Sequence, residues 1–368
     1  MGRSTKKPQR DNSRAKTGKA SSVELETLIE LRRLNGKSQW AFHGDASIEV
    51  QTIKGKGKGI VALRDFQPGE LVLAEPPLAA WNVIAIESGQ ADTAGLDATI
   101  AALDTNARRE YFELVDVHGT QLSFSPSGKI QPAANVASED GYEHKSAAGI
   151  WASNAFSTDA SDCFTPSNDA LTRCAVFKTI ARINHSCRPS SYCAWNPTLG
   201  LQAVHALRSI ERGEEITIAY LGGAAWDGTR TNRQLELERK YRFSCTCQAC
   251  SLCGDALERS EARLRRMIAT RESILASPPD LLERVEELCR LAEEEGQPII
   301  WHRTAMLEAM MHAKQAGRAQ EALGWAERGA ESALLAMGAE SPTTVKFEMV
   351  VTAFRNAMSR RPGAPLPG

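Results

Sequence analysis

The sequence lacks a run of about 18 apolar residues, so it has no segment long enough to cross a membrane as a helix. Its first residues, MGRSTKKPQRDNSRAKTGKASS, contain no apolar core, which excludes a secretory signal peptide there. The residue at position 6 is Lys6 rather than Ser or Thr, so Met1-Gly2 does not begin an acylation motif. We therefore expect an intracellular protein of the cytoplasm, the nucleus or both, without a membrane partner.

The chain also lacks an excess of charge, because 44 Lys and Arg face 45 Asp and Glu and give a net charge of -1. This balance argues against general affinity for nucleic acid, and we expect no specific nucleic-acid partner. Residues 1–20 differ, since they are rich in Lys and Arg and contain the single acid Asp11. We expect a disordered basic tail there, which is either only solvated or serves as a weak nuclear address or a contact for acidic partners.

Two common catalytic patterns are missing as well. The sequence shows no Ser-His-Asp arrangement and no pair of His residues with the spacing of a catalytic metal site. His205 and His302 therefore read as scaffold residues. Four scattered cysteines are expected to be small buried apolar residues, namely Cys163, Cys174, Cys193 and Cys289.

The pattern of apolar and polar residues changes along the chain and predicts an α+β protein. Short strand-like runs such as GIVAL and ELVLAE give way to an irregular stretch and then return before a long helical region. The expected segments are the basic tail 1–20, an N-terminal helix with its lead-in over 21–45, a β-rich domain over 46–220 with an insertion at about 78–150, a cysteine-containing segment over 221–255 and a helical domain over 256–368.

Capping signals and residue spacing predict where helices lie within these segments. Ser21 and Glu24 fit a capping box for a helix over 21–35, and Thr231 with Gln234 fits a second one before LELERKY. Within the insertion, one helix is expected over about 97–117, with loops around it. Small residues at helical spacing near the C-terminus, as in AQEALGWAERGAESALLAM, indicate closely packed helix pairs in the manner of tetratricopeptide arrays.

The segment YRFSCTCQACSLC contains four cysteines close together. Without a secretory signal, such a cluster favours metal binding over disulfides, and Cys245, Cys247 and Cys250 can reach one zinc ion. A structural zinc site needs a fourth ligand, for which Cys253 is local and Cys187, in RINHSCRPS, is distant. Closing the longer loop costs only about 1 to 2 kcal/mol more, against about 10 kcal/mol from zinc binding. Spacing alone therefore leaves both ligands open.

Four sequence blocks occur in an order that resembles the SET-domain lysine methyltransferases with a post-SET zinc site. The blocks are KGKGIVALRDFQPGELVLAEPPL, RINHSCRPSSYCAWN, HALRSIERGEEITIAY and YRFSCTCQAC. The resemblance covers roughly residues 46–253 and is to the SET and MYND branch and its fungal relatives with a helical-repeat C-terminus. Two departures stand out. The insertion has no cysteine for a MYND finger, and Ser190 replaces an Asn that is frequent in the family, which is expected to weaken a local hydrogen bond.

The resemblance implies a β-rich SET domain of short sheets with a threaded loop, a post-SET zinc site and an all-α C-terminal domain. In that family the NHSC cysteine joins three post-SET cysteines on one zinc ion. The implied ligands are thus Cys187, Cys245, Cys247 and Cys250, with Cys253 spare. This structural zinc would hold the post-SET segment, with Tyr241 and Phe243, against the loop that contains NHSC (residues 184–187, the NHSC loop). It would take no part in the reaction.

The resemblance also implies that the cofactor is S-adenosyl-L-methionine. Two glycines of KGKG let the backbone approach a ligand closely, and the neighbouring lysines can meet its carboxylate or ribose. Asn184 and His185 match residues that hold the amino and adenine ends of the cofactor, and Phe243 matches an aromatic residue that stacks on adenine. The full implied set is Lys56, Gly57, Lys58, Gly59, Asn154, Asn184, His185 and Phe243.

Two tyrosines are the implied catalytic residues. Tyr220 ends a strand before LGG, so its hydroxyl is expected to face a pocket, and Tyr241 is expected to help shape a lysine channel. Methyl transfer needs the amine, the methyl carbon and the sulfur nearly in line, and a desolvating aromatic channel lowers the pKa of the lysine.

The resulting hypothesis is an S-adenosylmethionine-dependent protein-lysine methyltransferase that acts on a lysine of a histone or non-histone protein. The helical domain would wall the substrate cleft and offer a surface for protein partners. One alternative is a catalytically silent SET scaffold that binds partners through its helices, although the retained Tyr220 and Asn184-His185 argue against it. Another is a zinc-stabilised interaction module that binds no cofactor.

Overall fold

The computed structural model describes residues 47–84, 93–118, 123–124, 130–131, 145–158, 171–222 and 228–359, all within one compact unit, Phe42–Gly368. The predicted tail, the predicted helix over 21–35 and Cys163 lie outside the described residues.

The described strands form small sheets, as expected for an α+β fold of this kind. One sheet has the order β1-β2-β12-β9, and the others have the orders β10-β11-β3, β4-β8-β7 and β5-β6. The strands are β1 (Ile48–Ile53), β2 (Gly57–Ala62), β3 (Leu71–Glu75), β4 (Ala79–Ile84), β5 (Ser123–Phe124), β6 (Ile130–Gln131), β7 (Phe156–Ser157), β8 (Leu171–Val176), β9 (Asn184–His185), β10 (Ser191–Asn196), β11 (Leu201–Ala206) and β12 (Glu215–Ile218).

The glycine-lysine loop forms the turn of the hairpin between β1 and β2. Gly55 and Gly57 have φ angles of 77° and 76°, a region that L side chains rarely adopt, which explains the two glycines at this turn. The turn is closed by the Lys56 amide, which donates to the Ile53 carbonyl at 3.0 Å. After the turn, β2 enters the core with Ile60 almost fully buried.

A parallel pairing brings distant parts of the chain together at the centre of the fold. Asn184 and His185 of β9 pair with Thr217 and Ile218 of β12, which is itself antiparallel to β2. The chain between them leaves the sheet to form the β10–β11 hairpin and then returns. The turn η3 (Ile180–Arg182) leads into β9. The threaded loop that the resemblance implied stays a prediction, and the parallel pairing is compatible with it.

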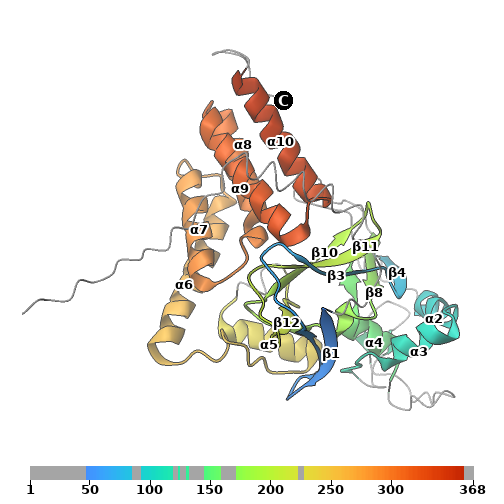
Figure 1. The fold of residues 1–368 in the computed structure, drawn as a ribbon. Coiled ribbons are helices and arrows are strands. Elements are labelled where there is room, and N and C mark those ends of the chain that lie inside the picture. The colour runs from blue at the N-terminus through green and yellow to red at the C-terminus, as the bar shows by residue number, and fades with distance from the viewer. Residues whose placement is uncertain are drawn as a thin grey trace, which may run out of the picture. The chain divides into compact units, whose positions relative to one another are not determined.

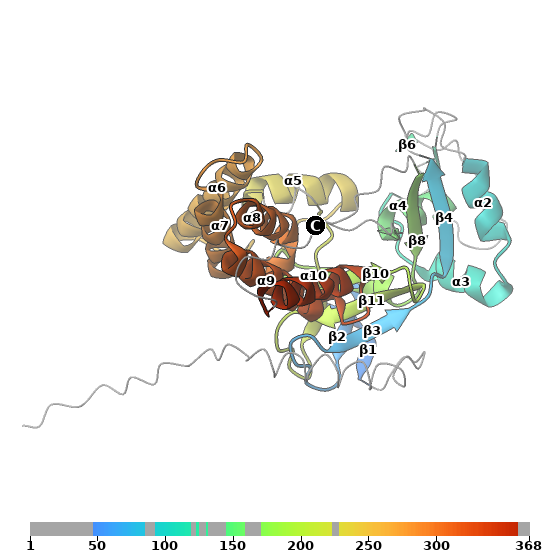
Figure 2. The ribbon, with the colours of Figure 1, turned by 90° about the horizontal axis from the view of Figure 1, so that it is seen from above.

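The insertion contains more regular structure than the sequence predicted. The single helix expected over 97–117 is wrong, because α2 (Thr93–Ala101) and α3 (Thr105–Glu113) are separate helices. The break occurs at Asp104, whose carboxylate caps α3 by accepting from the amides of Asn106 and Ala107 at 2.8 and 2.9 Å. Figure 2 shows α2 beside β4.

The described residues after β12 form helices joined by loops (Figure 1). Its helices are α5 (Arg230–Tyr241), α6 (Gly254–Ile274), α7 (Leu281–Glu295), the turn η5 (Ile299–His302), α8 (Arg303–Gln315), α9 (Ala319–Met337) and α10 (Pro342–Ser359). Small residues do allow close approach, since a Cβ added at Gly329 of α9 would lie 2.2 Å from the Phe347 ring of α10. None of the described helices combines the length and apolar character of a membrane span. The tetratricopeptide-like assignment stays a prediction.

The helices after β12 pack against the sheets, and α9 contacts both β10 and β11. At the end of α9, a Cβ added at Gly338 would lie 2.8 Å from His205 Nε2 of β11. Asn196, at the end of β10, donates from Nδ2 to the Glu340 carbonyl at 3.0 Å. His205 is buried in this contact, in line with the scaffold role expected for it.

A buried carboxylate connects the last turn of α7 to the loop after β9. Glu295, only 2% exposed, accepts from Arg188 at 2.7 Å, from the Ser260 hydroxyl at 2.6 Å and from Arg263 at 2.9 Å. Arg188 directly follows Cys187, so this network fixes the position of the NHSC loop relative to α6 and α7. A buried carboxylate is stable only when charges and hydrogen bonds of this kind compensate its lost hydration.

Replacing Glu295 with Gln should lower the free energy of unfolding by about 2 kcal/mol, because two arginines and a hydroxyl lose a charged acceptor while the shape is kept. The neighbouring Glu294→Gln variant is the matched control. Glu294 is 47% exposed and pairs only with Arg290 one turn away, so its loss should cost less than about 0.5 kcal/mol. Urea unfolding of both variants checks this, and equal effects would contradict a special role for the buried group.

Candidate functional site

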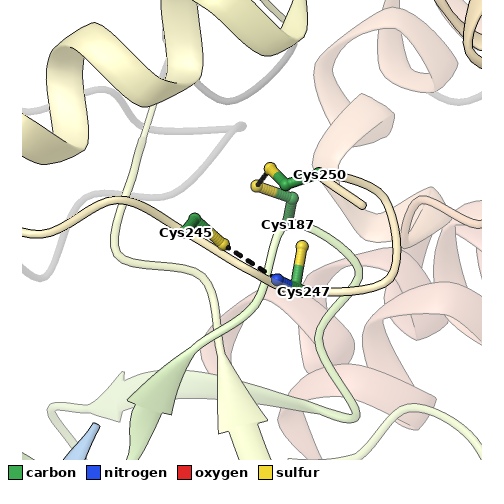
Figure 3. Close-up of side chains that lie close together, drawn as sticks. All are labelled: Cys187, Cys245, Cys247 and Cys250. Atoms are coloured by element: carbon green, nitrogen blue, oxygen red, sulfur yellow. Dashed lines mark hydrogen bonds between the residues drawn. The ribbon is translucent and has the colours of Figure 1, made fainter. Parts of the chain in front are cut away.

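The structure brings four cysteines from two distant segments into one group (Figure 3). The sulfur atoms of Cys187, Cys245, Cys247 and Cys250 all lie within 4.8 Å of one another, and the Cys187 and Cys250 sulfurs are 3.6 Å apart. Cys253 is exposed, precedes α6 and is not a member of the group. Spacing left Cys187 and Cys253 as two candidates for the fourth ligand, and the structure places Cys187 beside Cys245, Cys247 and Cys250.

The helix α5 positions the loop that carries three of these cysteines. Its N-cap is Thr229, which accepts from the Asn232 amide, so the predicted capping box at Thr231 is two residues too late. Gln234 has another role. Its side chain donates to the Cys245 carbonyl at 2.7 Å and accepts from the Cys245 amide at 2.8 Å. This pair of hydrogen bonds holds the loop to α5, and the sequence analysis missed it.

The chemistry of the four-cysteine group fits zinc. Hydrogen bonds from the Cys187, Cys245 and Cys250 thiols lower the pKa of Cys247, which favours a thiolate there. Arg233 is 3% exposed; burial alone would lower its pKa, but the charges of the Cys187 and Cys250 sulfurs outweigh burial and raise it. Four soft sulfur donors around one point, with a guanidinium beside them, can hold a structural zinc ion and its negative thiolates.

An aromatic group lies next to the cysteines. The ring centroid of Tyr220 is 5.0 Å from that of Tyr241, 5.4 Å from that of His185 and 6.3 Å from that of Phe243. The Tyr220 hydroxyl donates to the Ile183 carbonyl at 2.7 Å, which fixes the direction of the phenol. Burial, with smaller contributions from Tyr241 and Glu215, raises the pKa of Tyr220, so the hydroxyl stays neutral.

His185 joins this aromatic group to the cysteines. Its Nδ1 accepts from the Tyr220 amide at 3.0 Å, and its Nε2 lies 3.3 Å from the Cys187 sulfur. Burial lowers the pKa of His185 to about 4, so the ring is neutral and carries its proton on Nε2, facing the sulfur. Both ring nitrogens thus have partners inside the protein. The side chain thus bridges Tyr220 and Cys187, and its implied contact with a cofactor stays a prediction.

A polar group forms at the start of β2 and β12. The Lys56 ammonium lies 2.5 Å from one carboxylate oxygen of Glu215, and the Asn184 amide donates to the other at 2.9 Å. Asn184 also donates to the Lys58 carbonyl at 3.1 Å, while the Lys58 ammonium lies 3.5 Å from the Thr52 hydroxyl. The sequence analysis named both lysines and Asn184 but missed Glu215, although its place before ITIAY could have indicated it.

Gly59 permits this contact between β2 and β9. A Cβ added there would lie 2.7 Å from Asn184 Nδ2 and 2.5 Å from Ile53 Cγ1. We expect Gly59→Ala to displace Asn184 and to lower the free energy of unfolding by about 1 to 3 kcal/mol. In contrast, a Cβ at Gly324 of α9 meets no atom within 4 Å, so Gly324→Ala should stabilise the protein by up to about 1 kcal/mol. Thermal unfolding of the two variants checks this, and a stable Gly59→Ala protein would contradict the close approach.

The tyrosines line a small cavity. It has a volume of about 180 Å³, and its walls include Asn154, Phe156, Ala219, Tyr220 and Tyr241. Asn154 is 5% exposed and donates to the carbonyls of Val115 and Ile150 at 2.7 and 2.6 Å. Tyr220 therefore lines a pocket, and Asn154 lines the same pocket from the end of α4 (Ala147–Asn154). That the Tyr220 hydroxyl faces this pocket stays a prediction.

The departure at Ser190 does not loosen the loop as expected. Ser190 is fully buried, and its hydroxyl accepts from the Thr217 amide at 2.9 Å. In return, the Ser190 amide donates to the Thr217 hydroxyl at 3.1 Å. The reciprocal pair ties the NHSC loop to β12, so the shorter side chain still finds hydrogen-bond partners.

Comparison with known proteins gives a consistent result. Residues 57–221 match the family model described as SET domain. Histone-lysine N-methyltransferase set5 of Schizosaccharomyces pombe is 28% identical over 188 residues, which cover 49% of this chain and 57% of that protein. Histone-lysine N-methyltransferase SMYD3 of Homo sapiens is 31% identical over 137 residues, covering 36% and 29%. The chain thus spans little more than half of the first relative and less of the second.

Among solved structures, the chain is similar to Rubisco LSMT bound to AdoMet. The two are 14% identical, and the alignment covers 90% of this chain and 93% of that one, with a TM-score of 0.35. This likeness is too low to carry an argument about function, and the match over residues 57–221 remains the informative one.

Proposed function

We propose, from the match of residues 57–221 to the SET domain model, that the chain transfers a methyl group from S-adenosyl-L-methionine to a lysine side chain of a protein. The observation that carries the proposal is the half-buried Tyr220 phenol, oriented by the Ile183 carbonyl at the wall of a cavity that Tyr241 shares. The relatives named above are called histone-lysine methyltransferases, so the substrate class we propose is a histone or another intracellular protein.

The residues around β2 and β9 suit the proposed cofactor. When bound, S-adenosyl-L-methionine supplies a methyl group on a sulfonium cation. A Cβ added at Gly57 would meet no atom within 4 Å, so the backbone there is open to close approach, whereas Gly59 makes room for Asn184. Lys56, Lys58 and Asn184 supply polar groups beside them. Further contacts are assigned to Asn154 at the cavity, to the His185 backbone and to the half-buried Phe243.

The two tyrosines would prepare the amine of the substrate. Aromatic walls exclude water, which disfavours the charged ammonium and lowers the pKa of the entering lysine. Since the Tyr220 hydroxyl donates its hydrogen bond to the Ile183 carbonyl, its oxygen lone pairs remain to accept from the substrate amine and to stabilise positive charge near the methyl group. Tyr241, whose hydroxyl lies 3.4 Å from the Tyr220 carbonyl, would fix the opposite wall.

The four-cysteine group would hold a structural zinc ion. Cys187 follows β9, and Cys245, Cys247 and Cys250 follow α5, so the ion would join the two segments that carry Asn184 and Phe243. All four positions of a tetrahedral ion would be filled by protein, which leaves none for a substrate. Zinc would thus stabilise the site without taking part in the transfer.

Calorimetric titration of the zinc-loaded protein with S-adenosyl-L-methionine and S-adenosylhomocysteine tests the proposal. We expect saturable binding of both in the micromolar range, followed by transfer of labelled methyl groups to a lysine-containing protein mixture. A folded, zinc-replete protein that binds neither compound would overturn the proposal. Binding without transfer to any substrate would instead favour a silent scaffold that uses its helices to bind partners.

A further inference from the structure

A second, larger cavity adjoins the one lined by the tyrosines. Its volume is about 400 Å³, and it shares Phe156 and Ala219 with the smaller cavity. Its walls come from β10 and β12 on one side and from η5 and the start of α8 on the other. If the target lysine reaches Tyr220, as the proposed function requires, residues flanking that lysine would lie in this larger space.

Two polar side chains in the wall of this cavity have buried atoms without a hydrogen-bond partner among the described residues. Ser191 is 1% exposed, and its hydroxyl has no hydrogen-bond partner. The Nε of Arg303 is buried and equally without a partner, and the guanidinium makes one long contact from Nη1 to the Ile300 carbonyl at 3.4 Å. Polar groups are costly when left unpaired, so the weakly paired guanidinium of Arg303 in this wall favours a ligand that can accept hydrogen bonds.

The positive charge of Arg303 in the cavity wall favours a negatively charged hydrogen-bond acceptor. Among the described residues that line it, Arg303 is the one with a charged side chain. Tyr192 and Trp301 contribute aromatic walls, which limit the screening of that charge by water. A guanidinium in such a place matches the two oxygens of a carboxylate, because it can donate two parallel hydrogen bonds.

We propose that the larger cavity binds an Asp or Glu side chain near the target lysine, with Arg303 as its charged partner. This inference rests on the proposed function, since it assigns the sequence preference of the same site. It makes Arg303 a specificity-determining residue and the substrate an acidic segment around a lysine.

The test uses fluorescein-labelled peptides with one central lysine and with Glu or Gln placed at each flanking position in turn. Their affinities for the zinc-loaded full chain are measured by fluorescence anisotropy in the presence of S-adenosylhomocysteine, which requires no turnover. At one or two positions the Glu peptide should bind about tenfold more tightly than its Gln counterpart. The Arg303→Gln variant should lose this preference, and Arg303→Glu should reverse it.

Arg259→Glu is the matched control, because Arg259 is exposed on α6, does not line the cavity and gives the same change in net charge. It should keep the preference for Glu, and all variants should bind S-adenosylhomocysteine as the parent protein does. The inference is overturned if the parent protein shows no preference for Glu or if the preference survives in both Arg303 variants. A preference for Glu without methyl transfer would support the cavity assignment and count against the proposed reaction, so the two failures are distinguishable.

Discussion

Replacing Tyr220 with Phe is expected to reduce methyl transfer by roughly a hundredfold or more while leaving the affinity for S-adenosyl-L-methionine nearly unchanged. The phenol donates to the Ile183 carbonyl at 2.7 Å, so its oxygen is held in one direction and needs no reorientation during the reaction. Phenylalanine keeps the ring, and with it the packing against Tyr241 and His185, but removes the one oriented oxygen. The loss should therefore appear in kcat rather than in binding.

Tyr111→Phe supplies the matched control for this experiment. Tyr111 is fully buried in the insertion, and its hydroxyl donates to the Ala147 carbonyl at 2.8 Å, the same kind of hydrogen bond. Its loss should cost about 1 kcal/mol of stability and leave kcat unaltered. Single-turnover transfer of labelled methyl groups to a substrate found in the screen measures both variants. If Tyr220→Phe keeps more than a tenth of the rate, Tyr220 is a packing residue only.

The second large effect is expected for Cys187→Ser, which should abolish stable zinc binding and with it cofactor binding. Serine is a far weaker ligand for zinc than a thiolate, and one lost ligand opens a site that the other three cannot close. Because the ion would hold the NHSC loop to the segment after α5, its loss should lower stability by on the order of 5 kcal/mol. Metal content by mass spectrometry and thermal unfolding with and without a chelator provide the readouts.

Cys253→Ser is the control that separates the two ligand sets left open by spacing. Cys253 is exposed and outside the four-sulfur group, so the variant should keep its full zinc content and its melting temperature. The reverse result, with zinc lost in Cys253→Ser and retained in Cys187→Ser, would show that the local cysteine is the ligand and that the loops are not clasped.

The sequence was most informative where a local pattern decides the structure. The alternating residues of EEITIAY do form a strand at Glu215–Ile218, and the glycine-lysine stretch does form a turn at residues 54–56 before β2. It was least informative where two signals compete over a few residues. Thr229 rather than Thr231 caps α5, because both threonines can cap and only the packing of the helix selects one. Asp104 divides a stretch whose helical character looked continuous.

Contacts over long sequence distances could be obtained only from the resemblance or from the structure itself. Glu215 pairs with Lys56, which is 159 residues away, and neither residue type predicts the other. Loop entropy favoured Cys253 over Cys187 as the partner of the cluster, but the parallel pairing of β9 with β12 carries Cys187 into the group. The preference from chain length is small and is outweighed once the sheet has formed.

The same parallel pairing has a consequence for the order of events during synthesis. Cys187 precedes Cys250 by 63 residues, and β12, the partner of β9, lies between them. A nascent chain that has emerged only as far as β11 lacks β12, the strand that pairs with β9, and lacks the three cysteines that join Cys187. Non-local pairing of this kind is slow, so the core cluster around Ile183 would lack Ile216 and Ile218 until β12 has left the ribosome. A zinc ion held by all four cysteines would be bound later still, once Cys250 has emerged.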